Sequence, residues 1–303
     1  MTDDRPVNLY HYTNLSAFQS IVENSSLWFS NIADLNDIEE KKFGNQIFSS
    51  YVQQRVQQWA NDISADLEHQ FELEDLTANI SILKDWLFDL HMPDLYSTSF
   101  SYRVDDLMMW RSYASPPTGI CIGFKGDILR DVIESLAKSR DFNWVMGKIR
   151  YPTELQLLKG SFFTPSTKSF LNRLRVELIS EIKRLTDNFE RKFETLPWCH
   201  LRNEMDLHSI MYKHPAFKME QEFRFAISNC KNADLRYRQC GSAYKSYCEF
   251  EIPNLGKLID RVVIGPTPEP ERTLRSVRHF MEAKGVDLNK CKIESSTIPY
   301  RAW

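Results

Sequence analysis

Segments with the pattern of β-strands occur in three separated groups along this 303-residue chain, and long amphipathic helices are predicted between the groups. The helical stretches cover about residues 38–91 and 164–212. The strands do not show the regular strand–helix–strand alternation of a doubly wound sheet. The sequence therefore predicts a single α+β domain, residues 1–303, in which a mixed or antiparallel sheet is assembled from distant strands and carries two large helical insertions.

The predicted strands are short segments rich in apolar residues, and a helix follows the first of them. Thr13 or Asn14 is placed to cap that helix. Two further short helices are expected at DDLMMWRSYA and near residues 269–284. The strands, in chain order, are NLYHY, LWFSN, LYSTSFS, GICIGFK, a segment ending in GKIRY, EFRFAIS, YCEFEI, RVVIGP and KIESSTIP.

Composition excludes several common kinds of protein. The chain has only 10 glycines and no Walker-type or GxGxxG stretch, so the usual glycine-rich phosphate loops are not expected. Its formal net charge of −3 gives no bulk reason to bind nucleic acid, although local basic patches remain open. No apolar run approaches the roughly 18 residues of a membrane span, so a cytoplasmic protein without a membrane partner is expected. The six cysteines form no CxxC pair, and no metal is expected.

The first candidate site pattern is YHYT, at the end of the first predicted strand. Tyr10 and Tyr12 share one face of that strand, whereas His11 and then Thr13 point to the other. A histidine beside a helix N-terminus suits a sugar hydroxyl or a phosphate. The alternative is a core histidine whose ring is satisfied by a backbone carbonyl.

The second pattern is LYSTSFS, which places three hydroxyl residues in a row inside an apolar strand. Ser97 and Ser99 share a face with Ser101, whereas Thr98 and Phe100 face the other way. Small hydroxyl side chains on one face leave room for a ligand to lie against the strand. An edge strand with solvated serines is the alternative.

The third pattern is KMEQEFRF. Glu220, Glu222 and Arg224 are expected on one face of a strand, with Phe223 and Phe225 opposite. Two carboxylates at this spacing lie roughly 7 Å apart along a strand. One of them could hold a substrate hydroxyl while the other activates a nucleophile. A solvated strand face with a surface ion pair is the alternative.

Together these segments resemble a widespread bacterial family known as domain of unknown function 2971. The resemblance extends from Leu9 to about Arg301, and the two helical stretches are its variable parts. The family name implies no activity. The segments that carry the resemblance are YHYT, LWFSN, the DLND element at 34–37, LMMWRSYA, GICIGF, EQEFR, RVVIGP and IESSTIPYR.

The order of the three patterns is also similar to that of the ADP-ribosyltransferase fold, whose enzymes hold NAD with a first-strand His or Arg, a central Ser-Thr-Ser or Tyr and a catalytic Glu. The resemblance implies that His11 binds the adenosine-side ribose and that Ser97 and Ser99 support the nicotinamide-ribose pocket. It implies that Glu222 hydrogen-bonds the nicotinamide ribose and stabilises the cationic sugar, while Glu220 activates the acceptor.

The same resemblance adds further residues to the expected NAD site. An aromatic ring, from Tyr12, Tyr102 or Trp110, is expected to stack on the nicotinamide. Thr13 and Arg224 complete the set expected to bind the cofactor, which enters the reaction as a substrate.

The resulting hypothesis is an NAD-dependent ADP-ribosyltransferase-like protein, as a toxin or phage-defence effector that modifies nucleic acid or protein. A non-catalytic nucleotide- or nucleic-acid-binding sensor on the same scaffold is the alternative, indicated by aromatic residues and by Arg103, Arg111 and Lys148. A third hypothesis is an interaction protein that uses residues 166–195 to bind a partner. The acceptor, the retention of catalysis and the oligomeric state are left open by the sequence.

Overall fold

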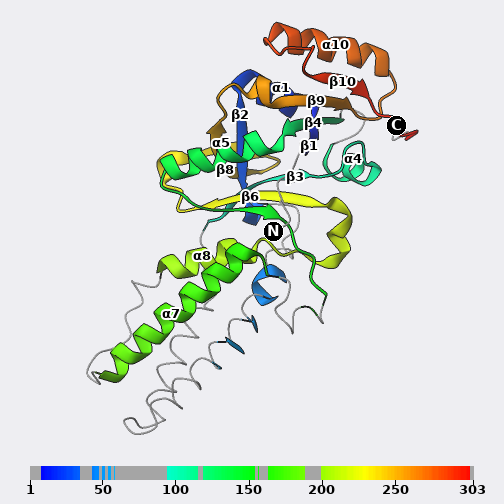
Figure 1. The fold of residues 1–303 in the computed structure, drawn as a ribbon. Coiled ribbons are helices and arrows are strands. Elements are labelled where there is room, and N and C mark those ends of the chain that lie inside the picture. The colour runs from blue at the N-terminus through cyan, green and yellow to red at the C-terminus, as the bar shows by residue number, and fades with distance from the viewer. Residues whose placement is uncertain are drawn as a thin grey trace. The chain divides into compact units, whose positions relative to one another are not determined.

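A computed structural model gives the structure of two compact units (Figure 1). The sheet unit consists of residues 1–35, 94–149 and 216–303, and the helical unit of residues 36–93 and 150–215. The helical unit thus contains both segments expected as insertions, although most of the first lies outside the described residues. The structure describes residues 8–34, 43–47, 50, 51, 54, 55, 58, 94–114, 119–153, 156, 163–187 and 199–300.

The described part of the sheet unit forms a ten-stranded mixed sheet, as the sequence predicts for an α+β fold. Its main path is β10-β9-β4-β1-β3-β2-β8-β7, and β6 joins β3 to β5. The β9–β10 pair is parallel, and the other pairs are antiparallel. The strands are β1 Asn8–Asn14, β2 Ser26–Asn31, β3 Tyr96–Ser101, β4 Gly119–Lys125, β5 Asn143–Lys148, β6 Glu222–Ser228, β7 Leu235–Cys240, β8 Ala243–Glu251, β9 Ile259–Ile264 and β10 Lys292–Ser295.

The described α-helices of the sheet unit are α1 Leu15–Asn24, α4 Leu107–Tyr113, α5 Gly126–Ser139, α9 Leu255–Leu258 and α10 Pro270–Ala283. Asn14, and not Thr13, caps the first helix, because its Oδ1 accepts a hydrogen bond of 2.8 Å from the backbone N–H of Ala17. Four of these helices, α1, α5, α9 and α10, form a large apolar core with alternate strand residues on one face of this sheet, whereas α4 packs on the other face against Tyr10 and Tyr12. Their members of the core include Phe18, Leu129, Ile133, Leu255, Val277 and Met281.

The sheet divides at β3. One edge of β3 is occupied along its whole length by β6. The other edge is shared, because β2 pairs with it at Ser97 and β1 pairs with it at Ser101. Between these two pairings the carbonyl of Ser99 accepts a hydrogen bond of 3.0 Å from Nδ1 of His11. We call this part of β3, residues 97–101, the fork.

Strand β7 is absent from the expectations and is found at the end of the sheet, paired only with β8 among the described strands. Its side chains are exposed, apart from a partly buried Leu235. A strand with no buried face has no apolar alternation, so its sequence carries no periodic signal.

The helical unit contains α7, Pro165–Asp187, and α8, Cys199–Ser209. Phe170 and Leu174 of α7 are fully buried, and the ring of Phe170 stacks on His208 of α8 at 5.1 Å between centroids. These contacts favour core packing over partner binding for this part of the helix. The side chains of Leu178, Ile182 and Leu185 on the same predicted face lie outside the described residues. None of the described helices has the length and apolarity needed to cross a membrane.

We expect the replacement Phe100→Ala to lower the free energy of unfolding by about 3–5 kcal/mol, measured by urea denaturation. Phe100 is buried at the fork, and its ring contacts those of Phe124 and Phe225 at 5.8 and 5.7 Å. The control is Ile128→Ala on α5, where the side chain is 48% exposed and the loss should stay within about 0.5 kcal/mol. Equal losses for the two variants would contradict the placement of Phe100 in the core.

Candidate functional site

Ser99 is the residue at which the three sequence patterns meet. Its hydroxyl donates a hydrogen bond of 2.6 Å to Oε1 of Glu222, and its carbonyl accepts the bond from His11. The antiparallel register of β3 and β6 explains the first contact, because it places Ser99 opposite Arg224 and Ser101 opposite Glu222 on one face. Residues from three distant parts of the chain therefore form one hydrogen-bonded group.

Glu222 and Arg224 form a buried ion pair on that face. Arg224 Nε lies 2.6 Å from Glu222 Oε1, and the two side chains are only 6% and 3% exposed for Glu222 and Arg224 respectively. Charges taken out of water need close partners, since desolvation alone is strongly unfavourable. The pair and the Ser99 hydroxyl together fix the orientation of the Glu222 carboxylate. Glu222 and Arg224 therefore share a strand face, as predicted, and that face is buried, so the alternative of a solvated face with a surface ion pair is wrong.

The prediction that Glu220 shares the strand face of Glu222 is wrong. Glu220 is the last residue of a 3₁₀ helix, Pro215–Glu220, and Gln221 between the two glutamates has a left-handed backbone with φ of 44°. This turn ends the helix before β6 starts, so strand alternation does not apply to Glu220. The carboxylate of Glu220 accepts a hydrogen bond of 2.6 Å from the hydroxyl of Tyr113 at the end of α4.

The serines of β3 have different environments. Ser101 Oγ donates to the carbonyl of Glu220 at 2.7 Å and accepts from the backbone N–H of Arg103 at 3.0 Å. Ser97 Oγ is buried and has no hydrogen-bond partner among the described residues, and the same holds for Ser228 Oγ at the end of β6. Buried hydroxyls are nearly always hydrogen-bonded in proteins, so the Ser97 hydroxyl at the fork is a position where a water or a ligand group can bond.

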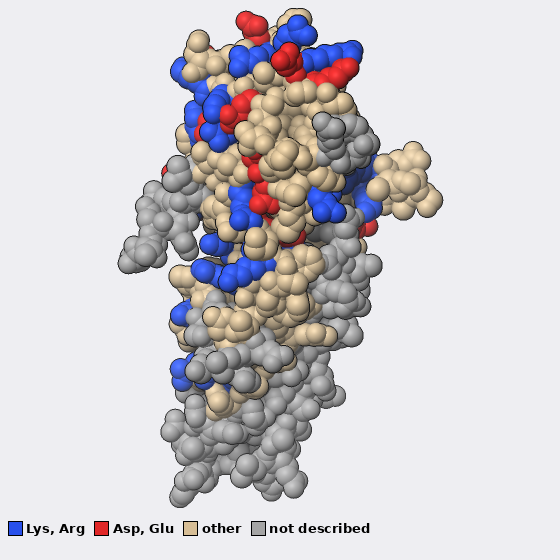
Figure 2. Space-filling view, turned by 90° about the vertical axis from the view of Figure 1, so that its right-hand side faces the viewer, with Lys and Arg blue, Asp and Glu red and all other residues tan. Residues whose placement is uncertain are grey.

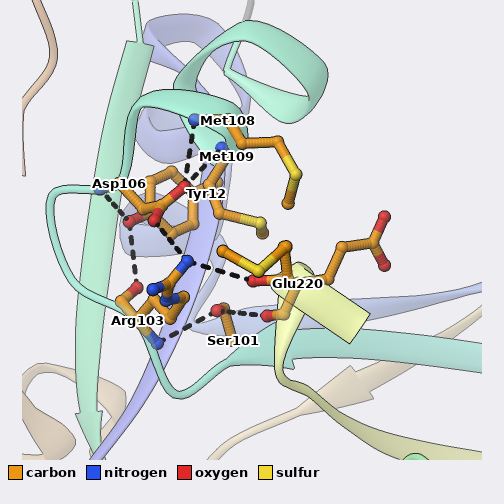
Figure 3. A network of polar contacts seen from close by, with 8 residues as sticks. Tyr12, Ser101, Arg103, Asp106, Met108, Met109 and Glu220 are labelled. Carbon is orange, nitrogen blue, oxygen red and sulfur yellow. Dashed lines mark hydrogen bonds and ion pairs between the residues drawn. The ribbon is translucent and has the colours of Figure 1, made fainter. Parts of the chain in front are cut away.

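The segment between β3 and α4 is fixed to β1 by a small polar network (Figure 3). The Tyr12 hydroxyl donates to the carbonyl of Arg103 at 2.9 Å and accepts from the backbone N–H of Asp106 at 3.1 Å. The Arg103 guanidinium pairs with the Asp106 carboxylate at 2.9 Å. Asp106 also caps α4 by accepting from Met108 and Met109. The network holds the start of α4, and with it Tyr113, near the fork.

The rings of Tyr12 and Trp110 pack against each other, with centroids 4.8 Å apart in an edge-on arrangement. Trp110 is fully buried and Tyr12 nearly so, and burial raises the pKa of the Tyr12 phenol. Both belong to a small apolar cluster that includes Cys121 and Val263. The structure therefore makes them packing residues, and either ring would stack on nicotinamide only if this cluster opened. Tyr102 is more accessible, and the Lys148 ammonium lies 5.5 Å from its ring centroid.

His11 lies on the opposite face of the sheet from Tyr12, as predicted, and its ring is 5.5 Å from that of Phe100. Thr13 is buried two residues further along β1. Because a carbonyl only accepts, the proton of the neutral His11 ring is on Nδ1, and Nε2 is an acceptor. Burial lowers the pKa of His11, against a smaller opposing effect of the hydrogen bond to Ser99. The structure thus gives His11 the contact of the alternative expectation, a ring satisfied by a backbone carbonyl, and places it on the face opposite the Ser99 hydroxyl and Glu222.

Asp105 is a residue that the sequence analysis missed. Its backbone is left-handed, with φ of 52°. Its carboxylate accepts from the backbone N–H of Thr297 at 2.9 Å, from the Ser296 hydroxyl and from Trp110 Nε1 at 2.9 Å. Burial alone raises the pKa of Asp105, but these hydrogen bonds outweigh it and hold the pKa below its ordinary value. The sequence signal for Asp105 is that two consecutive aspartates precede α4 and only one of them, Asp106, is needed to cap the helix.

Within the described residues, no group of three or more His, Cys, Asp or Glu side chains is arranged to hold a metal ion. The polar side chains on the Ser99 face of the fork are serine hydroxyls and a carboxylate–guanidinium pair, and the neutral His11 ring lies on the opposite face. Such groups are suited to a ligand with hydroxyls and a nearby positive charge.

Comparison with known proteins gives a family match in the central part of the chain. Residues 109–225 match the family described as "Protein of unknown function (DUF2971)", which confirms the expected resemblance over this range. The range includes Glu220 and Glu222, whereas His11 and Ser99 precede it. No curated protein and no solved structure matches the chain.

We expect Arg224→Met to lower the free energy of unfolding by about 3–5 kcal/mol, because it leaves the Glu222 carboxylate buried without its cation. The double variant Glu222→Gln/Arg224→Met should be less destabilised than Arg224→Met alone, since the uncompensated charge is gone. Urea denaturation measures both. Arg272→Met, at an exposed ion pair on α10, is the matched control and should change stability by less than about 1 kcal/mol. A double variant as unstable as the sum of its singles would contradict a buried pair.

The pH dependence of stability should contain a contribution from His11. Its pKa is lowered from 6.5 in the folded protein, so the unfolded chain takes up the proton first as the pH falls. The contribution of neutral His11 to the free energy of unfolding is fully present above about pH 6.5. It declines below that pH, by at most about 1.4 kcal/mol per pH unit. His11→Asn keeps a donor for the Ser99 carbonyl but does not titrate, so its stability should fall less between pH 7 and pH 5.

The measurement is urea denaturation at a series of pH values, with His279→Asn on the exposed side of α10 as the control. That control should keep the pH dependence of the wild-type protein. An unchanged pH dependence in His11→Asn would show that the ring titrates alike in the folded and unfolded states.

Proposed function

We propose that the protein transfers ADP-ribose from NAD and that its fold is of the ADP-ribosyltransferase type, with Ser99, Glu222 and Arg224 at the catalytic centre. One observation carries the proposal: His11 and Glu222 both hydrogen-bond Ser99, although they are 88 and 123 residues away from it in sequence. The three patterns that suggested the enzyme class are thus brought to one residue. A further support is the division of the sheet at that residue.

Glu222 is the proposed catalytic carboxylate. In the reaction the bond between C1′ of the ribose and the nicotinamide nitrogen breaks, and its electron pair leaves with nicotinamide. The sugar then carries positive charge, which a carboxylate held against the ribose hydroxyl stabilises. Arg224 and Ser99 orient this carboxylate through their 2.6 Å hydrogen bonds. The acceptor forms the new bond at C1′, and its proton passes to Glu220, the proposed base.

The other two polar residues of the patterns are proposed to support this centre. His11 lies on the opposite face of the sheet, where its Nδ1 bond fixes the Ser99 carbonyl and with it the strand that carries the Ser99 hydroxyl. The unsatisfied hydroxyl of Ser97 supplies a donor and acceptor beside the nicotinamide ribose. A bound dinucleotide would thus satisfy a group that has no partner among the described residues.

A non-catalytic sensor of NAD or another nucleotide is the second candidate, and one observation favours it. Arg224 neutralises Glu222 at 2.6 Å, which reduces the ability of the carboxylate to stabilise a second positive charge. Such a protein would bind the ligand through the same residues without breaking the glycosidic bond.

Calorimetric titration of NAD into the purified protein, together with an assay of nicotinamide release, tests both candidates. We expect the wild type to bind NAD and Glu222→Gln to lose at least about a hundredfold in release while still binding. His11→Ala, which removes the donor to the Ser99 carbonyl, should bind NAD about tenfold more weakly, whereas His11→Asn, whose amide can donate in its place, should bind as the wild type does.

Glu251→Gln, an exposed carboxylate at the end of β8, is the matched control and should change neither quantity. Binding without release by the wild type would favour the sensor. A folded wild type that binds no NAD would exclude the proposed reaction.

A further inference from the structure

The β7–β8 hairpin has an unusual composition for this chain. Residues 235–247, LRYRQCGSAYKSY, contain three tyrosines and three basic residues but no acidic residue. The chain as a whole has a net charge of −3, and the side of the molecule seen in Figure 2 shows basic and acidic side chains interspersed. The hairpin is therefore a local cationic and aromatic segment in a chain with a slightly negative net charge.

Two of the tyrosines are strongly exposed on one face of the hairpin. Tyr237 is 63% and Tyr244 is 76% exposed. The register pairs Tyr237 with Ser246 and Tyr244 with Gln239, so the two rings are diagonal neighbours on the same face. Large aromatic side chains left this exposed in a folded chain are typical of a surface that binds something flat and partly polar.

The other face of the hairpin carries the basic residues next to an ordered aromatic stack. The rings of Trp28 and Tyr247 are stacked at 4.2 Å between centroids, with 25° between their planes. The Arg238 guanidinium lies 5.8 Å from the Trp28 ring centroid, and Arg236 is opposite Tyr247 in the register. Lys245 donates to the backbone carbonyl of Asp34, which leaves its charge uncompensated by a carboxylate in this contact.

A continuous row of side chains connects this face of the hairpin with the fork. In the register Ser97 is opposite Ser30, Ser30 is opposite Tyr247, and Tyr247 is opposite Arg236. Paired residues of an antiparallel sheet point to the same face, so the row crosses β3, β2, β8 and β7 on one side of the sheet. Three strand spacings amount to about 14 Å. A ligand bound along the hairpin would therefore lie within reach of the fork.

We propose that the β7–β8 hairpin binds a single-stranded nucleic acid that passes around the outer edge of β7, so that its bases stack on Tyr237 and Tyr244 on one face and its phosphates are held by Arg236, Arg238 and Lys245 on the other. Single strands are recognised by this combination of aromatic platforms and cations, because every base has a face to stack and every nucleotide has a phosphate. The inference rests on the proposed function in one respect: the strand would be the class of acceptor that receives ADP-ribose. Its binding does not depend on NAD.

The test is fluorescence anisotropy of a labelled 12-nucleotide single-stranded DNA, an RNA of the same sequence and the corresponding DNA duplex, at 50 and 200 mM salt. We expect single strands to bind more tightly than the duplex, with affinity falling about twentyfold over this salt range if three phosphates are neutralised. The DNA and RNA arms identify which kind of strand is preferred.

Tyr237→Ala/Tyr244→Ala should weaken binding at least tenfold, whereas Tyr237→Phe/Tyr244→Phe should retain it, because phenylalanine keeps the stacking face. Arg236→Gln/Arg238→Gln should weaken binding and flatten its salt dependence. Arg272→Gln/Arg275→Gln, on the exposed side of α10, removes the same charge elsewhere and should change binding by less than the hairpin variant does. All replaced side chains are exposed, and circular dichroism checks that each variant is folded.

No binding of either single strand by the folded wild type, equal binding by the tyrosine-to-alanine variant, or a preference for the duplex would overturn the proposal. The tyrosine variants should bind NAD as the wild type does. A protein that binds single strands through the hairpin but does not bind NAD would disprove the proposed reaction and leave hairpin binding intact. NAD turnover without strand binding would disprove hairpin binding and leave the proposed reaction intact. Transfer of label from NAD to the bound strand would establish the strand as the acceptor.

Discussion

The carbonyl of Ser99 is the group on which the arrangement of the candidate site depends. It lies on the edge of β3 where β2 has ended its pairing and β1 has not yet begun, so neither of these two described strands supplies a backbone donor. A buried carbonyl without a hydrogen bond is unfavourable, and a histidine side chain from β1 takes the place of the missing backbone N–H. The separation of the two strands and the position of His11 are thus one structural feature.

The polar face of β3 and β6 contributes less to stability than an apolar face would. An apolar pair of similar volume at Glu222 and Arg224 would often be as stable or more so, because burying two charges costs about as much as their attraction returns. The hydroxyls of Ser97 and Ser228, which have no partner among the described residues, destabilise the same face further. On the opposite face, by contrast, the same strands contribute phenylalanines to the core. This polar face is the part of the sheet on which the proposed function rests.

The proposed reaction and the proposed hairpin interaction use different physical properties of one sheet. The fork relies on a few hydrogen bonds of defined geometry, whose atoms must be correctly placed for a dinucleotide to bind. The hairpin relies on exposed rings and charge, which tolerate any sequence of bases and many positions of a flexible strand. The register row from Ser97 to Arg236 connects the two, so that a nucleic-acid strand bound at the hairpin could reach Glu222 at the fork.

The sequence by itself determined which residues form most strands and which side chains share a face. Tyr12 and His11 do lie on opposite faces, Ser99 and Ser101 do face together, and the α+β class with a mixed sheet is correct. These are local properties, since alternation along a strand depends only on backbone geometry. Glu220 left the predicted face because one left-handed residue interrupted that alternation, and β7 was missed because its exposed side chains have no apolar period.

Only the tertiary structure decided which distant strands are neighbours, that β1 and β2 share one edge of β3, and that Trp110 is buried rather than available to a ligand. Such facts are set by the pairing and register of segments separated by a hundred residues, and by the total volume that must be packed between them. No property of a single segment encodes them.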